Sequence, residues 1–98
     1  MEITVLHNEP SSRFEVVLDT HLSMVEYERS AGRIAFTHTE VPHELEGRGV
    51  ASALARHVLQ FARDNQLKVV PLCPFILSYI RKHKAEYADI LAPGYEGI

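Results

Sequence analysis

Residues 41–51 read VPHELEGRGVA, and the sequence pattern changes across this stretch. Before it, apolar residues alternate with polar ones, as in half-buried strands; after it, they recur every three or four positions, as in an amphipathic helix. Gly47 and Gly49 let the backbone approach a ligand closely, and the N-terminus of the following helix adds free N–H groups and a partial positive charge. The stretch therefore predicts either an anion-binding turn or a plain strand-to-helix connection.

The first forty residues predict an antiparallel meander of four strands. Turn-forming residues at positions 8–11, 19–21 and 30–32 separate the strands. The apolar residues that mark them are Ile3, Val5 and His7, then Phe14, Val16 and Leu18, then Met24, Val25 and Tyr27, and finally Ile34 and Phe36.

Beyond Gly49 the pattern predicts a helix, a short strand and a second helix. The first helix carries an apolar stripe and should end near residues 64–65, residues 68–72 read as a buried strand, and Pro74 is expected to start the next helix. Residues 87–91 look like one or two further helical turns. A parallel, right-handed crossover should join the last two strands, giving an α+β fold in a single domain of residues 1–98.

Composition narrows the partners and the setting. The 98 residues carry 10 Lys plus Arg and 13 Asp plus Glu, a net charge of -3 that argues against binding duplex nucleic acid. The single Cys73 excludes an intramolecular disulfide. The first ten residues lack the features of a signal peptide, and no run of apolar residues is long enough to span a membrane. We expect a cytoplasmic protein that is not membrane-bound; the sequence does not indicate its oligomeric state.

Three segments carry a family resemblance. EGRGVA at residues 46–51 resembles the pyrophosphate-binding loop of the GNAT acetyltransferases, commonly written Q/R-x-x-G-x-G/A, although Glu46 stands where Gln or Arg is usual. IAFTHTEVP at residues 34–42 and PLCPFILSYIRKHKAEY at residues 71–87 are similar to a branch of small single-domain GNAT-like N-acetyltransferases. The resemblance implies a truncated GNAT-like acyl-CoA N-acyltransferase fold that binds acetyl-CoA, with the pantetheine arm between the fourth and fifth strands.

The resemblance also implies which residues bind the cofactor. Because the carboxylate of Glu46 adds no attraction for phosphate, binding must come from backbone N–H groups, from Arg48 and from Arg56. A backbone N–H near Val41 would stabilise the oxyanion. The residues expected to contact the cofactor are Val41, Glu46, Gly47, Arg48, Gly49, Val50, Ala51 and Ser52. The basic residues at 81–84 would either meet an adenosine 3′-phosphate or form a solvated helix end.

Two candidate catalytic side chains lie on the fourth strand. Strict alternation places His38 and Glu40 on one face with Ile34 and Phe36, with their Cα atoms roughly 7 Å apart. An alkylammonium with a pKa of ~10.4 must lose a proton before it can attack an acyl group. Glu40 would accept that proton directly, or His38 through a water molecule. The alternatives are a histidine satisfied within the sheet and a solvated glutamate at the strand end.

Two further candidates follow the fifth strand. Cys73 precedes Pro74 and is expected at the N-cap of the second helix, where the helix dipole favours thiolate. It is either an acetyl-accepting nucleophile, as the resemblance suggests, or a small buried apolar residue. Tyr79 has a spacing similar to that of the superfamily tyrosine that protonates the departing CoA thiolate; otherwise it is a core aromatic.

A zinc site is not expected. The pattern H-x-E at residues 38–40 and P-x-C at residues 71–73 partly matches the zinc deaminases, but Ile76 replaces their second cysteine. The prediction is an N-acetyltransferase that moves acetyl from acetyl-CoA to a small-molecule or peptide amine. The alternatives are a CoA-binding module without turnover and an acyl-thioester carrier that uses Cys73.

Overall fold

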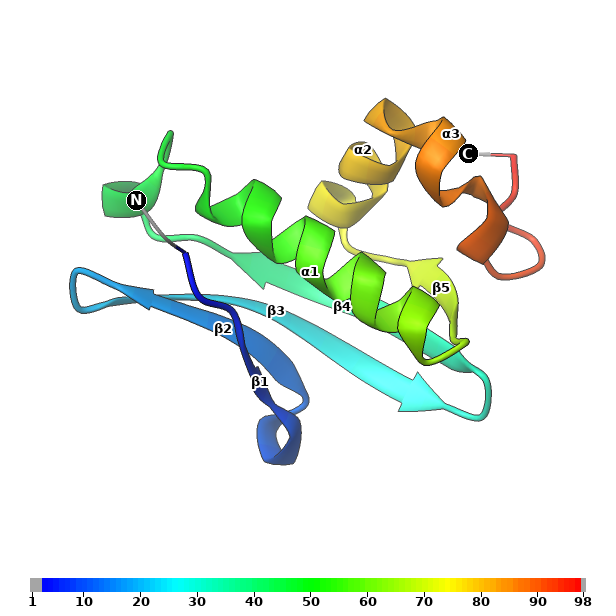
Figure 1. Cartoon of the computed structure of the whole chain (residues 1–98), viewed down its shortest axis with the longest axis horizontal. Helices are drawn as coiled ribbons and strands as arrows, with labels where there is room; N and C mark the ends of the chain where they lie inside the picture. The colour runs from blue at the N-terminus through cyan, green and yellow to red at the C-terminus, as the bar shows by residue number, and fades with distance from the viewer. Residues whose placement is uncertain (1–2, 98) are drawn as a thin grey trace.

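The computed structural model describes residues 3–97 and contains one five-stranded sheet with its α-helices on one face (Figure 1). The strands, in their order across the sheet, are β1 (Leu6–Asn8), β2 (Arg13–Leu18), β3 (His21–Ser30), β4 (Arg33–Glu40) and β5 (Lys68–Pro71). The helices are η1 (Glu9–Ser11), η2 (His43–Leu45), α1 (Val50–Asp64), α2 (Pro74–Lys82), α3 (Lys84–Tyr87) and η3 (Ala88–Ile90). Strands β1 to β4 are antiparallel and β5 runs parallel to β4, which confirms the predicted order.

The hydrophobic core lies between the sheet and the helices. Helix α1 packs on β2, β3 and β5, and α2 packs on β4 and β5. The largest fully buried side chains come from both layers: Phe14, Val16, Val25, Ile34, Phe36, Leu45, Val50, Leu54, Val58, Leu59, Ile76 and Ile80. On the other sheet face, which we call the open face, side chains are half-buried or exposed, and no helix of residues 3–97 covers it (Figure 1). No helix in this part of the chain is long and apolar enough to cross a membrane.

The first strand is shorter than predicted, and the side chain of His7 adds contacts to its short ladder. Only Leu6–Asn8 joins the ladder, while Ile3 and Val5 pack against the core without pairing. The ring of His7 stacks on Phe14 with 4.1 Å between the ring centroids, and its Nε2 lies 2.7 Å from the hydroxyl of Tyr27. Burial lowers the pKa of His7 below its ordinary value, so the neutral imidazole is favoured here.

A β-bulge at Thr37 reverses the faces of the last residues of β4. The pairs on its two sides are Phe36 with Tyr27, His38 with Glu26, Thr39 with Val25, and Glu40 with Met24. Thr37 is therefore an extra residue on β4, and Thr39 joins Phe36 on the helix-covered face. His38 and Glu40 lie on the open face, so the prediction that they share a face with Ile34 and Phe36 is wrong. One additional residue shifts the period-two alternation and turns every later side chain over.

Strand β4 extends beyond the end of β5. The last pair of the parallel ladder is Phe36 with Pro71, and the backbone N–H of Cys73 then donates to the carbonyl of Phe36 at 2.8 Å. The chain turns into α2 at Pro74, whereas β4 continues to Glu40. Residues 37–40 thus have no strand beside them on this side within the described part of the chain. We call this segment the open edge of β4.

Candidate cofactor site and active site

Helix α1 begins at a glycine turn that provides no side-chain cap. Gly47 and Gly49 have φ values of +76° and +82°, a region that glycine adopts without steric cost. Gly49 is the N-cap residue, where Ser, Thr, Asp or Asn would usually accept hydrogen bonds from the first turn. The first turn of α1 also contains no acidic residue. The local sequence therefore leaves the N–H groups at this helix end without a side-chain partner.

Five residues whose backbone N–H groups have no protein acceptor within residues 3–97 line a pocket at this turn. Within residues 3–97, no acceptor receives a hydrogen bond from the N–H groups of Gly47, Gly49, Val50, Ala51 or Ser52. The pocket has a volume of about 280 Å³ and is lined by Val41, Leu45, Glu46, Gly47, Gly49, Val50, Ala51 and Ser52. It brings together seven of the eight residues predicted to contact the cofactor; only Arg48 is not part of its lining. Their binding role stays a prediction.

The charged side chains beside the pocket contact other side chains of the protein. Arg48 Nη1 lies 2.6 Å from Asp19 Oδ2, which ties the glycine turn to the turn between β2 and β3. The carboxylate of Glu46 lies 3.4 Å from Nδ1 of His43. Arg56 does not line this pocket but a separate one of about 400 Å³ beside Ile3 and Val5. Backbone N–H groups, rather than these side chains, are thus the donors presented by the turn.

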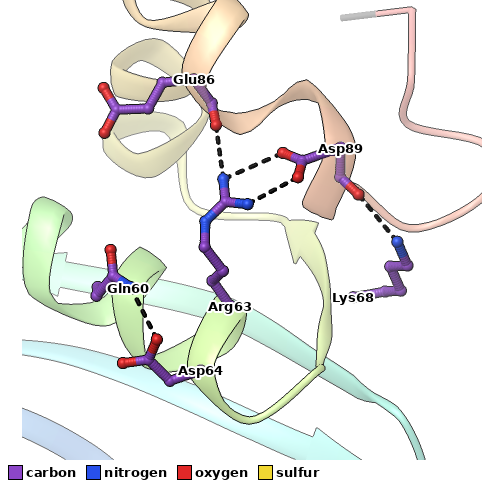
Figure 2. Close-up of polar contacts among 6 residues, drawn as sticks. All are labelled: Gln60, Arg63, Asp64, Lys68, Glu86 and Asp89. Atoms are coloured by element: carbon purple, nitrogen blue, oxygen red, sulfur yellow. Dashed lines mark hydrogen bonds and ion pairs between the residues drawn. The ribbon is translucent and has the colours of Figure 1, made fainter.

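Side-chain contacts join the opposite end of α1 to η3 and β5. Figure 2 shows the guanidinium of Arg63 between the carboxylate of Asp89 and the carbonyl of Glu86, at 2.7 Å and 2.6 Å. Lys68 Nζ donates to the carbonyl of Asp89 at 2.9 Å. The hydrogen bonds from Arg63 lower the pKa of the Asp89 carboxyl, and the carboxyl in turn raises the pKa of Arg63. These contacts fasten η3 to the C-terminal end of α1.

Cys73 is buried and its thiol faces β4. It occupies the N-cap position of α2, as predicted, and is only 2% exposed. Its Sγ makes no capping hydrogen bond and instead lies 3.0 Å from Oγ1 of Thr39. Nothing in the sequence pattern singled out Thr39, because simple alternation places it on the face opposite Phe36. The bulge at Thr37 is what brings Thr39 to the thiol.

His38 and Glu40 form a pair on the open face of β4. His38 Nε2 lies 3.3 Å from Glu40 Oε2, and the two side chains are 54% and 62% exposed. Cys73 lies on the other side of the strand, so the structure keeps the candidate base and the candidate nucleophile apart. Within residues 3–97, no carboxylate or imidazole hydrogen-bonds to the thiol. The same residues contain no group of three His, Cys, Asp or Glu side chains that could hold a metal ion.

Tyr79 belongs to a row of aromatic rings along α2 and α3. Its ring centroid lies 6.5 Å from that of Phe75, 4.3 Å from that of His83 and 6.0 Å from that of Tyr87. Tyr79 is half-buried, whereas Tyr87 is buried, and that burial is the main cause that raises the pKa of Tyr87 to about 12. The basic residues 81–84, at the junction of the two helices, are all exposed.

Comparison with known proteins identifies the family. A family model described as GCN5-related N-acetyl-transferase matches residues 13–90. The chain belongs to the GCN5-related N-acetyltransferase (GNAT) family. Protein NATD1 of mouse is 33% identical over 95 residues, covering 93% of this chain and 86% of the mouse protein. Human protein NATD1 is also 33% identical, covering 93% of this chain and 84% of the human one.

A solved structure shares the fold. The solution structure of a GCN5-like protein from Staphylococcus aureus matches with a TM-score of 0.66 and 28% sequence identity, covering 93% of this chain and 87% of that one. Together with the family match, this confirms the predicted truncated GNAT fold and the resemblance to a small branch of the family. The glycine turn, the open edge of β4 and the α2 N-terminus are the parts of this GNAT domain that carry its candidate site.

Proposed function

We propose that this chain binds acetyl-CoA and transfers the acetyl group to the amine of a small molecule or peptide. The observation that carries the proposal is the uncapped N-terminus of α1, where five residues whose N–H groups have no protein acceptor within the described residues line one pocket. A diphosphate supplies acceptor oxygens and negative charge, which such a helix end favours. Because GNAT proteins generally use acetyl-CoA, we infer that the anion bound here is the diphosphate of this cofactor.

The residues at the turn fit a diphosphate in shape and in charge. A Cβ built on Gly47 would meet no atom within 4 Å, so the space beyond this glycine is open to a ligand. No acidic side chain in the first turn of α1 would repel phosphate. The nearest carboxylate, that of Glu46, is paired with His43. The backbone of Gly47, Gly49 and the first turn would therefore hold the diphosphate, and the open edge of β4 would accept the pantetheine arm.

The chain's own groups would then perform the transfer. Acetyl-CoA supplies an acetyl carbon that is activated as a thioester. The backbone N–H of Val41 would donate to the carbonyl oxygen as negative charge develops on it. Before the amine attacks, Glu40 would take the proton from its ammonium form directly, or His38 would take it through water and pass it to Glu40 across their 3.3 Å contact. Tyr79 would return a proton to the departing thiolate.

The separation of the two sides of β4 favours direct transfer to the amine. The His38 and Glu40 side chains are exposed on the open face, so an amine arriving from that face would meet its base. The Cys73 thiol lies on the helix side of the strand and has no base hydrogen-bonded to it within residues 3–97. An acetyl-enzyme route would need such a base to activate the thiol.

A second candidate function is an acyl-thioester carrier that uses Cys73. It is favoured by one observation, the position of the thiol beside the open edge of β4, where it contacts Thr39. A carrier would retain the acetyl group on Cys73 and gain about 42 Da, the increment expected for covalent acetylation.

Calorimetric titration with acetyl-CoA, CoA and pantetheine tests the proposal. We expect saturable binding of acetyl-CoA and CoA and much weaker binding of pantetheine, because pantetheine lacks the diphosphate. Incubation with acetyl-CoA and a panel of amines should then release CoA and acetylate an amine. No binding of CoA up to millimolar concentration would contradict the cofactor assignment. Tight CoA binding without amine turnover would favour a binding module, and an added acetyl mass that is lost in Cys73→Ala would favour the carrier.

A further inference from the structure

The side chain and the backbone of Cys73 are both held by β4. Its N–H donates to the carbonyl of Phe36 at 2.8 Å, at the last pair of the parallel ladder. Its Sγ lies 3.0 Å from Oγ1 of Thr39, three residues further along β4. The thiol is 2% exposed, so this contact is shielded from water. The hydroxyl of Thr39 therefore joins the open edge of β4 to the corner where β5 turns into α2.

The thiol of Cys73 does not point toward the first turn of α2, although its position would allow this. A polar side chain at the N-cap usually turns back to accept hydrogen bonds from the first turn of its own helix. Cys73 is the N-cap residue of α2, and Pro74 follows it at the first helical position, yet Sγ makes no capping hydrogen bond. Contact with Thr39 replaces the cap. The hydroxyl of Thr39 is thus the polar group that selects the direction of the thiol.

The bulge at Thr37 is the backbone feature that makes this contact. Without the extra residue, Thr39 would pair with Met24 rather than with Val25 and would lie on the open face. Bulges are frequent next to active sites, where they re-aim a side chain. The bulge sends Thr39 to the thiol and sends His38 and Glu40 to the open face at the same time.

We propose that Thr39 is a positioning residue that turns the thiol of Cys73 away from the N-terminus of α2 and toward the open edge of β4. The catalytic consequence rests on the second candidate function, in which Cys73 accepts the acetyl group from an acyl arm that lies along this edge. The thiol then faces the acyl group. In a chain without the Thr39 hydroxyl, the thiol rotates onto the free N–H groups of α2, where a helix N-terminus stabilises thiolate.

Thiol reactivity tests the positioning role without any cofactor. The variants are Thr39→Val, which removes the hydroxyl at constant shape, Thr39→Ser, which keeps it, and Thr4→Val, a control that makes the same change at an exposed residue outside β4. We expect iodoacetamide at pH 7 to alkylate Thr39→Val roughly fivefold to tenfold faster than wild type, because more of the thiol is thiolate. Thr39→Ser and Thr4→Val should react like wild type. Equal rates in all four proteins would overturn the proposal, and so would a uniform increase in all three variants.

A second measurement separates this proposal from the proposed function. In intact-mass assays with acetyl-CoA, Thr39→Val should add the acetyl mass to Cys73 about tenfold more slowly than wild type, and Thr39→Ser should restore the rate. Circular dichroism checks that each variant folds; if Thr39→Val does not fold, Thr39→Ala takes its place. If CoA neither binds nor protects Cys73 from alkylation, the cofactor assignment fails while the alkylation result still decides the role of Thr39. An equal loss of rate in Thr4→Val would indicate a merely structural effect.

Discussion

The two ends of α1 treat their unpaired backbone groups in opposite ways. At the C-terminal end, the backbone N–H and the side chain of Asn65 both donate to the carbonyl of Phe61, and the N–H of Leu67 donates to that of Ala62. Gln66 adopts a left-handed conformation, with φ of +57°, to allow this closure. At the N-terminal end, Gly49 offers no cap.

The difference shows where the protein leaves hydrogen-bonding capacity for another molecule. Unpaired backbone groups cost stability when they are shielded from water, so most helices satisfy them with caps. The chain has done so at the C-terminal end, where the N–H groups of Asn65, Gln66 and Leu67 donate to the carbonyls of Phe61, Arg63 and Ala62. At the glycine turn, no side chain of the N-cap residue does so, because Gly49 has none and its φ of +82° disfavours any other residue there. That contrast is the physical basis of the proposed diphosphate site.

The largest expected effect comes from the middle of the helix, which holds both ends in place. Leu54 is fully buried, and Leu54→Ala should lower the free energy of unfolding by about 3 kcal/mol through lost burial and a cavity. Urea denaturation measures this, with Gln60→Ala at an exposed position as the control. A change below about 1 kcal/mol would mean that neighbouring side chains move to fill the cavity left by Leu54.

A negative charge placed in the first turn of α1 should weaken ligand binding without lowering the stability of the protein. In Ser52→Asp, the new carboxylate lies in the first turn of α1, where it interacts favourably with the helix dipole but repels a diphosphate. We expect CoA to bind about 30-fold more weakly, a loss of about 2 kcal/mol, while the melting temperature stays the same or rises slightly. Calorimetry and thermal denaturation measure the two effects. Unchanged CoA affinity would place the diphosphate elsewhere, and Ser52→Asn is the neutral control.

At the C-terminal end of α1, we expect a substitution to lower stability without changing ligand binding. Asp89→Asn weakens the contact with Arg63 and should lower the melting temperature at neutral pH without changing CoA affinity. Because the folded protein lowers the pKa of Asp89, this stabilisation is present above the ordinary aspartate pKa and is lost as the pH falls through the lowered value. The difference between variant and wild type should therefore disappear at strongly acidic pH. A melting difference that persists there would show that the ion pair is not its source.

The smallest expected effect is a pH dependence from the contact between β1 and α1. The ring of His7 lies edge-on to Phe61 of α1, at 4.9 Å between centroids, and burial lowers its pKa. The neutral form is favoured by folding, so His7 should destabilise the protein as the pH falls below about 6.5, its ordinary value. Stability measured from pH 8 to pH 5 should fall less steeply in His7→Phe, whereas His43→Gln should follow wild type. Identical slopes in His7→Phe and wild type would contradict this role.

Parts of the fold that depend on short-range pattern were predictable. Helix α1 spans Val50–Asp64, as the glycine turn and the apolar stripe indicated, and α2 begins at Pro74. The pocket at residues 41–52 gathers the residues of the glycine turn because they are adjacent in sequence. Ladder length was less predictable: β1 pairs over only Leu6–Asn8, although the neighbouring strand β2 continues to Leu18.

The candidate catalytic residues show the limit of such reasoning. His38 and Glu40 were identified as candidates, but their face was not, and Thr39 was missed. A bulge leaves no mark in the alternation of one strand, because it is defined by the register between two strands. The contact between Cys73 and Thr39 could not be predicted from the sequence either. The two residues are 34 positions apart, and the bulge decides on which face Thr39 lies.

The sequence by itself determined the order of strands and helices, the glycine turn with its free N–H groups, and the membership in the GNAT family that its motifs suggested. These features depend on backbone preferences and periodicity within a few neighbouring residues. Only the tertiary structure decided which side of β4 each candidate residue occupies, that Arg48 is paired with Asp19, and that the thiol of Cys73 faces Thr39. Those outcomes depend on strand register and on packing between segments distant in the chain, which local pattern does not encode.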